Sequence, residues 1–167
     1  MVEYPTVSRK VASLSLVGVA IKKLFFADIK DTLILKGVLE RLMIYTSYFA
    51  KLPRLPKNIT PISICAKAPS WYSGLEYKRL APKYGFFMEW KQNHNNDYYI
   101  KCFNEQVLGN LNPNDVIVDL SQLDYRFSTG ENDICLLCYE KPIDFCHRHL
   151  VAEWFRKNGF NCEEYKF

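Results

Sequence analysis

The chain has 167 residues, of which 49% are hydrophobic and 15% are aromatic, and its formal net charge is +4. This length suits one domain rather than two, and the apolar content excludes a globally disordered chain. Residues 1–42 carry a charge of +3, so residues 43–167 carry only +1. A nearly neutral domain gives no support to non-specific nucleic-acid binding, although it excludes no specific nucleic-acid partner.

Residues 1–42 are predicted to be an N-terminal extension, either poorly ordered or part of a mis-assigned start, ahead of a compact domain at 43–167. The apolar run at 11–21 is shorter than the roughly 20 residues that a membrane-spanning helix needs. Two lysines follow it directly, where a signal peptide would have a cleavage site of small residues. We therefore expect no membrane partner. The alternative for this segment is an accessory helix or strand pair that packs on the domain.

The cysteines favour a reduced protein. Three of the six, Cys65, Cys102 and Cys135, lie in apolar periodic segments, where a free cysteine behaves as a small buried hydrophobe. We expect a cytoplasmic location, with a disulfide-stabilised secreted domain as the alternative.

From residue 43 onward, short apolar runs alternate with helical patterns. Residues 43–48 are rich in β-formers and predict the first strand, whereas residues 51–57 hold two prolines and predict a loop. Residues 59–66 predict a second strand, with Pro61 near its beginning and Lys67 directly after its end.

The middle of the chain is mainly helical in its pattern. Residues 71–84 give mixed signals and predict only a short helical or irregular piece. Residues 86–94 are predicted to be helical, Asp97 to cap a helix at 98–111, and residues 114–125 to form a further amphipathic helix. The sequence contains no phosphate-binding glycine loop and no dinucleotide-binding fingerprint.

Residues 134–139 are a short apolar run, which predicts a buried strand. Pro142 follows it, and Asp144 is expected to cap a helix that Gly159 ends. Residues 160–167 predict a final strand. Strands separated by helices favour an α/β fold with a small, mainly parallel sheet flanked by helices, in a single domain after the N-terminal extension.

The polar residues of this strand–loop–helix unit gather where the strand becomes the helix. Because side chains alternate along a strand, Cys138 and Glu140 share one face. Cys146, His147 and Arg148 follow at the expected start of the helix. We expect all five to converge on one crevice at the carboxyl edge of the sheet, where open α/β sheets bind ligands.

These residue types predict a thiol-based catalytic site. Cys146 is expected in the first helical turn, where unpaired amides and the helix dipole stabilise a thiolate, so it is the candidate nucleophile. Glu140 and His147 are candidate proton carriers, and Cys138 completes the catalytic set.

Two cations are candidates for binding the negative group of a substrate. Arg148 offers a planar, permanently charged fork for carboxylate or phosphate, and the amides at the helix start form an anion site with it. Lys67 follows the second strand and, in a parallel sheet, lies at the same edge as Glu140.

The pair of elements Cys138-Tyr139-Glu140 and Cys146-His147-Arg148, separated by a short Pro-containing loop, is similar to the C-terminal motif of the bacterial and phage domain-of-unknown-function family 488. The resemblance covers about Met43 to Phe167. Three longer segments also resemble the family, at residues 44–64, 74–82 and 136–155.

This resemblance implies a compact α/β domain with an active site at the motif, and it implies no particular reaction. Members of the family typically carry an Asp-Val-Arg-like element after the second strand. This chain has Ile64-Cys65-Ala66-Lys67 instead. Lys67 would then be the basic group at that place, without the fork that binds an anion in a bidentate way.

Two classes of function remain. The first is an enzyme that acts on an anionic small molecule or a nucleotide-like substrate through the Cys/His/Arg/Glu site. The second is a non-catalytic module that binds a ligand or a metal through the same residues. No cofactor is predicted. In the metal alternative, zinc would be held by members of the set Cys138, Cys146, His147 and His149.

Overall fold

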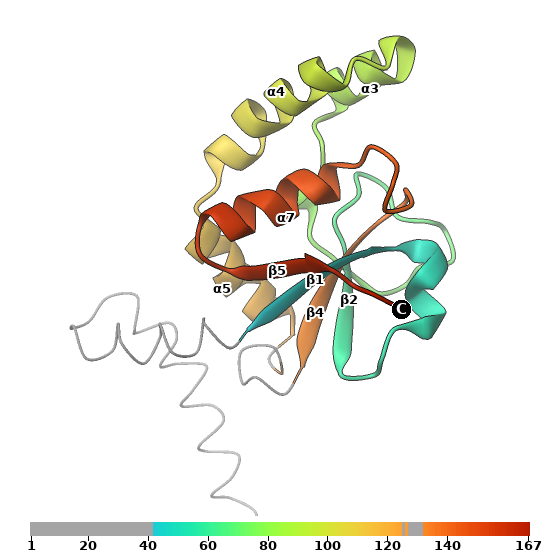
Figure 1. The fold of residues 1–167 in the computed structure, drawn as a ribbon, viewed down its shortest axis with the longest axis vertical. Helices are drawn as coiled ribbons and strands as arrows, with labels where there is room; N and C mark the ends of the chain where they lie inside the picture. The colour runs from blue at the N-terminus through green and yellow to red at the C-terminus, as the bar shows by residue number, and fades with distance from the viewer. Residues whose placement is uncertain (1–41, 125, 127–131) are drawn as a thin grey trace, which may run out of the picture. The chain divides into compact units, whose positions relative to one another are not determined.

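In the part of the chain that the computed structural model describes, residues 42–124, 126 and 132–167, five parallel strands form one sheet (Figure 1). Their spatial order is β3-β2-β4-β1-β5. The predicted α/β class with a small parallel sheet is therefore confirmed. The predicted N-terminal extension lies outside the described residues, apart from Leu42. The strands are β1 (Met43–Tyr48), β2 (Ile59–Ser63), β3 (Leu75–Glu76), β4 (Asp133–Cys138) and β5 (Asn161–Glu164).

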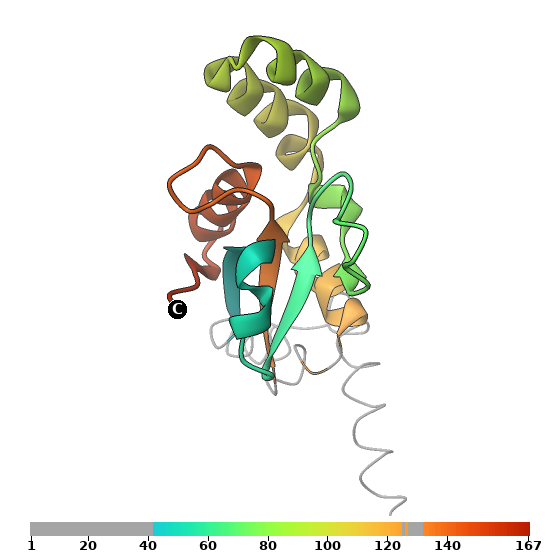
Figure 2. The same ribbon diagram turned by 90° about the vertical axis from the view of Figure 1, so that its right-hand side faces the viewer.

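Helices connect the strands. The α-helices are α3 (Tyr84–Asn93), α4 (Asn96–Gln106), α5 (Pro113–Leu123) and α7 (His147–Lys157), and the 3-10 helices are η1 (Phe49–Arg54), η2 (Lys78–Leu80) and η3 (Leu108–Asn110). Figures 1 and 2 show α3 and α4 side by side, beyond the carboxyl ends of β2 and β4. Within the described ranges, none of the helices has the length and apolar character needed to cross a bilayer.

Strand β4 is the centre of the sheet, between β2 and β1. Every side chain at 134–138 is buried. A parallel strand that is covered on both faces has no polar side, which explains the continuous apolar run in the sequence. The predicted strand–helix unit is present as β4 followed by α7. Gly159 follows α7 with φ of +84°, a left-handed conformation that favours glycine, so the predicted helix end is also confirmed.

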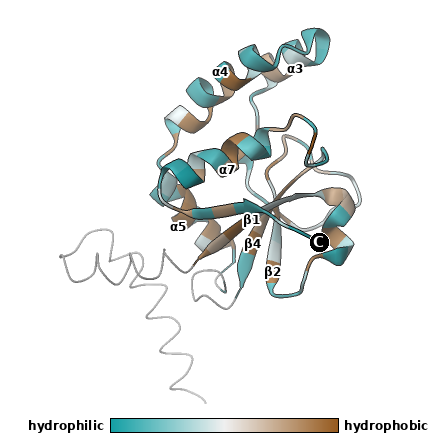
Figure 3. Cartoon of the chain, viewed as in Figure 1, coloured by the Kyte–Doolittle hydropathy of each residue, from teal (hydrophilic) through white to brown (hydrophobic). Residues whose placement is uncertain are grey.

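Different elements cover the two faces of the sheet. On the face that carries Leu136, α7 contacts β1, β4 and β5 and buries Val151 and Phe155 completely. On the other face, Leu137 packs in a cluster with Phe49 of η1. Figure 3 shows hydrophilic and hydrophobic stretches alternating along α7, as expected for a helix with one buried side.

Several predicted boundaries are wrong by a few residues. The second strand, predicted at residues 59–66, ends at Ser63. Ser63 pairs with Leu137, and β4 ends one residue later, so β4 offers almost no further residues with which residues 64–66 could pair. The predicted helix at 98–111 is divided into α4 and η3, and η3 contains Gly109, a poor helix former. The predicted loop at 51–57 begins inside η1.

Two predicted helix caps are also wrong. Asn95 caps α4 instead of Asp97, because its side chain accepts a hydrogen bond from the amide of Tyr98 over 3.0 Å. Asp144 does not cap α7, because that helix begins later, with Cys146 as its N-cap residue. Cys146 therefore precedes the first helical turn.

Candidate functional site

A cleft of about 630 Å³ opens where the carboxyl ends of β2 and β4 meet the start of α7. Cys65 and Lys67 line it from the segment after β2, Cys138 and Glu140 from the end of β4, and His147 from α7. The carboxyl edge of parallel strands is the usual ligand position in open α/β sheets. The structure thus brings residues from two strands and one helix to a single cleft.

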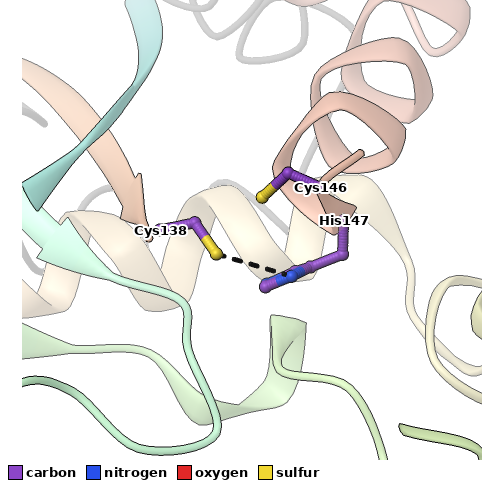
Figure 4. A group of neighbouring side chains, drawn as sticks. All are labelled: Cys138, Cys146 and His147. Carbon is purple, nitrogen blue, oxygen red and sulfur yellow. Dashed lines mark hydrogen bonds between the residues drawn. The ribbon is translucent and has the colours of Figure 1, made fainter. Parts of the chain in front are cut away.

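Cys138, Cys146 and His147 point toward one another (Figure 4). The Sγ atom of Cys138 lies 3.6 Å from Nδ1 of His147, and Nε2 of His147 lies 3.0 Å from the backbone carbonyl oxygen of Ile64. A carbonyl oxygen only accepts hydrogen bonds, so Nε2 carries the hydrogen atom. In the neutral ring, Nδ1 then presents its lone pair to Cys138. The imidazole is therefore oriented to accept the single proton of that thiol when the thiol does not donate it to Glu140.

Glu140 is a half-buried carboxylate beside the same thiol. The Sγ atom of Cys138 donates to Oε2 of Glu140 over 3.3 Å. Burial pushes the pKa of Glu140 upward, but hydrogen bonds from Cys146, from the backbone and from Cys138 outweigh burial and lower the pKa below its usual value. Glu140 is consequently ionised at neutral pH and places a negative charge beside the thiol.

Both clustered thiols are protonated at rest. The hydrogen bond with Cys138, together with burial, raises the pKa of Cys146. The hydrogen bond from Cys146 lowers the pKa of Cys138, but the neighbouring Cys65 and burial outweigh it and raise the pKa well above its ordinary value. This direction gives no support to the expected thiolate at Cys146. The residue is only 4% exposed, and burial beside a second thiol outweighs the start of α7.

Arg148 is fully buried and does not line the cleft. Its Nε and Nη2 atoms donate to the two carboxylate oxygens of Glu164 over 3.2 and 3.3 Å, and Nη1 donates to the carbonyl oxygen of Glu140 over 2.6 Å. The guanidinium thus joins α7 to β5 and holds the backbone just after β4. This arrangement gives no support to the predicted role of Arg148 in binding an anion.

Lys67 has the position that the sequence predicted, on the rim of the cleft. It is exposed, and its carbonyl oxygen accepts a hydrogen bond from the hydroxyl of Tyr139 over 2.8 Å, which links the segments after β2 and β4. Its ammonium group can contact a ligand in the cleft as a point charge.

The possible metal ligands of the sequence analysis are only partly brought together. The ligand atoms of Cys138, Cys146 and His147 all lie within 4.8 Å of one another, and this is the only group of its kind among the described residues. His149 does not belong to it. Burial and the positive charge of Arg148 lower the pKa of His149.

Aromatic side chains that the sequence patterns did not assign to the site form one wall of the cleft. Trp90 of α3, Tyr99 of α4 and Phe145 line it together, with 5.5 Å between the ring centroids of Trp90 and Phe145 and 5.2 Å between those of Tyr99 and Phe145. Lys91 adds a second cation to the lining. The high aromatic content of residues 84–99 is the one signal in the sequence that could have indicated this wall.

Comparison with known proteins assigns the chain to a protein family. A family model named DUF488-N3a and described as "Active DUF488-N3 subclade" matches residues 49–159. The matched range contains Cys138, Glu140 and the whole Cys146-His147-Arg148 element. No curated protein and no solved structure matches the chain. The family match covers more than half of the chain and agrees with the resemblance in the motif, so the chain belongs to the DUF488 family.

Proposed function

We propose that the protein is an enzyme that acts on an anionic small molecule or a nucleotide-like substrate bound in the cleft, with Cys138 and His147 as its reacting pair. The observation that carries this proposal is the orientation of His147. Its Nε2 hydrogen is directed to the carbonyl oxygen of Ile64, so Nδ1 faces the thiol of Cys138 at 3.6 Å. A nucleophile, a base and a group that orients the base are the usual parts of nucleophilic catalysis.

In this proposal, Nδ1 of His147 accepts the proton of the Cys138 thiol as its sulfur attacks an electrophilic centre of the substrate. The imidazolium then returns the proton to the group that leaves. A water molecule, deprotonated by His147, next breaks the bond between the sulfur and the substrate, and the imidazolium returns its proton to the sulfur of Cys138. Glu140, whose pKa is lowered, supplies a negative charge that stabilises the imidazolium. The raised pKa of Cys138 keeps the thiol neutral until this transfer takes place.

Cys146 was the nucleophile that the sequence favoured, and its neighbour Cys138 now takes that role because it makes the direct contact with His147. Cys146 then lies beside Cys138, with its sulfur atom within 4.8 Å of the ligand atoms of Cys138 and His147, and it lowers the pKa of Cys138 and of Glu140. Arg148 serves as a positioning residue, since it holds the carbonyl oxygen of Glu140.

The lining of the cleft supports an anionic, planar substrate. Lys67 and Lys91 place two positive charges in the lining, and Trp90 and Phe145 offer aromatic surfaces on which a flat group can stack. The description of the matching family model includes the word "Active", which agrees with an enzymatic role. The six buried, free thiols support the further proposal of a reducing compartment such as the cytoplasm.

The test is a search for turnover. Anionic metabolites and nucleotides that raise the melting temperature of the full chain would be incubated with it, and the change in substrate mass followed over time. We expect Cys138→Ser and His147→Asn to lower the rate at least ~100-fold, the scale of general acid–base catalysis. Cys102→Ser is the matched control, because Cys102 is a buried cysteine of α4 that does not line the cleft.

Two results would contradict the proposal. Full turnover by Cys138→Ser would remove this thiol from the mechanism, and loss of turnover only in Cys146→Ser would return the nucleophile to the residue that the sequence favoured. Ligand binding without any turnover would favour the alternative, a non-catalytic binding module.

A further inference from the structure

We propose that Cys138, Cys146 and His147 form a zinc site with three protein ligands and a fourth coordination position that faces the cleft. This goes beyond the proposed function, because it gives the same side chains a second, metal-bound state. Two thiolates and one imidazole are a ligand set that Zn²⁺ prefers, and three protein ligands with an open position are typical of zinc sites that bind a water molecule or a substrate.

The distances fit a tetrahedral ion. Zinc–sulfur and zinc–nitrogen bonds of about 2.3 and 2.0–2.1 Å place two such ligand atoms about 3.5 Å apart. Sγ of Cys138 and Nδ1 of His147 lie 3.6 Å apart. All three ligand atoms lie within 4.8 Å of one another, so the sulfur atom of Cys146 needs at most about 1 Å of adjustment.

The hydrogen bond from the other ring nitrogen of His147 prepares the imidazole for a metal. A ligating histidine commonly donates its other ring N–H to a backbone carbonyl group or a carboxylate, which fixes the tautomer. His147 makes this contact from Nε2 to the carbonyl oxygen of Ile64 over 3.0 Å. The nitrogen that remains, Nδ1, is the one directed to Cys138.

Charge favours the metal in this apolar setting. Cys138 and Cys146 belong to a buried cluster with Phe49 and Leu137, where an isolated thiolate is costly. Two thiolates balance the charge of one Zn²⁺ ion, and a coordinating thiol is deprotonated by the ion itself. The site therefore becomes electrically neutral when it is loaded, before Glu140 is counted.

The fourth position opens on the cleft, which Cys138, Cys146, His147 and Glu140 all line. In the loaded site, Zn²⁺ binds Nδ1 of His147, so the imidazole can no longer accept the proton of a thiol. The zinc-bound protein is therefore a state in which the Cys138–His147 pair cannot react, and removal of the metal returns Cys138 to its contact with His147.

The experiment uses the reduced full chain, freed of metal with a chelator and titrated with zinc against a coloured competing chelator. We expect one equivalent of zinc to bind. Cys138→Ala and His147→Ala should each weaken zinc binding more than about 100-fold, since loss of a hydrogen bond that only orients a metal ligand already costs about 10–100-fold. Cys102→Ala and His149→Ala are the matched controls and should bind like the unaltered chain.

Cobalt provides a readout that needs no variant. Bound Co²⁺ should show thiolate-to-metal charge-transfer absorption. Binding of less than one equivalent, a cobalt spectrum without thiolate bands, or equal zinc affinity in Cys138→Ala and Cys102→Ala would overturn the proposal.

The outcomes for the two proposals are separable. If zinc fails to bind, turnover by the metal-free chain still tests the Cys138–His147 pair. If zinc binds as described while Cys138→Ser retains full turnover, the result supports the metal site and contradicts the proposed role of Cys138 as the nucleophile.

Discussion

Removal of the Glu164 carboxylate is expected to destabilise the domain strongly, because it leaves the guanidinium of Arg148 buried without a counter-ion. The side chain of Arg148 is 0% exposed and that of Glu164 is 28% exposed, and their two hydrogen bonds measure 3.2 and 3.3 Å. Thr46 of β1 also donates to Glu164, over 2.7 Å. One carboxylate thus connects β1, β5 and α7.

The magnitude follows from what is left behind. A buried ion pair that loses one partner typically costs about 3–5 kcal/mol, and we expect this loss for Glu164→Ala. Arg148→Met should cost less, about 1–3 kcal/mol, because the partly exposed Glu164 regains water and the main uncompensated group is the carbonyl oxygen of Glu140. The order of the two losses is as informative as their size.

Urea unfolding of the two variants, followed by circular dichroism, measures both losses as a shift in midpoint at constant slope. The matched control is Glu163→Ala, an exposed neighbour on β5, which should stay within about 0.5 kcal/mol of the unaltered chain. If Glu164→Ala unfolds within about 1 kcal/mol of this control, Arg148 has another counter-ion in solution and the assignment of a structural role is wrong.

Three further predictions follow from single contacts. Phe155→Ala should lower the free energy of unfolding by about 3–5 kcal/mol in urea, because this side chain of α7 is fully buried. Burial pushes the pKa of Asp124 upward, but hydrogen bonds from Arg126 outweigh burial and lower this pKa below 3.8. The ionised carboxylate therefore stabilises the fold above this pH, and the stabilisation is lost as the pH falls further. The difference in unfolding free energy between the unaltered chain and Asp124→Asn should accordingly shrink when unfolding is measured in acid. Trp90→Ala should weaken the binding of a ligand that stacks in the cleft by about 1–3 kcal/mol, as measured by calorimetry. Trp154 does not line the cleft, so Trp154→Ala should leave the binding free energy unchanged.

Local signals explain what could be predicted from the sequence. The apolar run of β4 and the helical spacing of α7 are properties of short, continuous segments. The position of Cys138, Glu140 and His147 at one edge then follows from strand alternation and from the parallel order of the sheet. The site could be located because all three residues lie within ten positions of one another.

Long-range packing explains what could not be predicted. Arg148 follows His147 directly, yet its guanidinium turns to Glu164, a residue of β5 whose place beside β1 no local pattern specifies. The aromatic wall of the cleft could not be predicted for a similar reason. Trp90 lies on a helix of which only Phe86 is buried, so the apolar residues give no clear core-facing period.

The two proposals for the cleft start from the same physical fact. Neighbouring thiols and burial raise the pKa of Cys138 and of Cys146, so each sulfur keeps its proton until another group removes it. His147 can accept that proton from Cys138 when a substrate is present, and Zn²⁺ can displace protons from both thiols when the metal is present. Both events need Nδ1 of His147 with its lone pair directed inward. The hydrogen bond from Nε2 to the carbonyl oxygen of Ile64 is therefore the contact on which either chemistry depends, and that contact is supplied by the backbone just beyond β2 rather than by a side chain that sequence patterns could reveal.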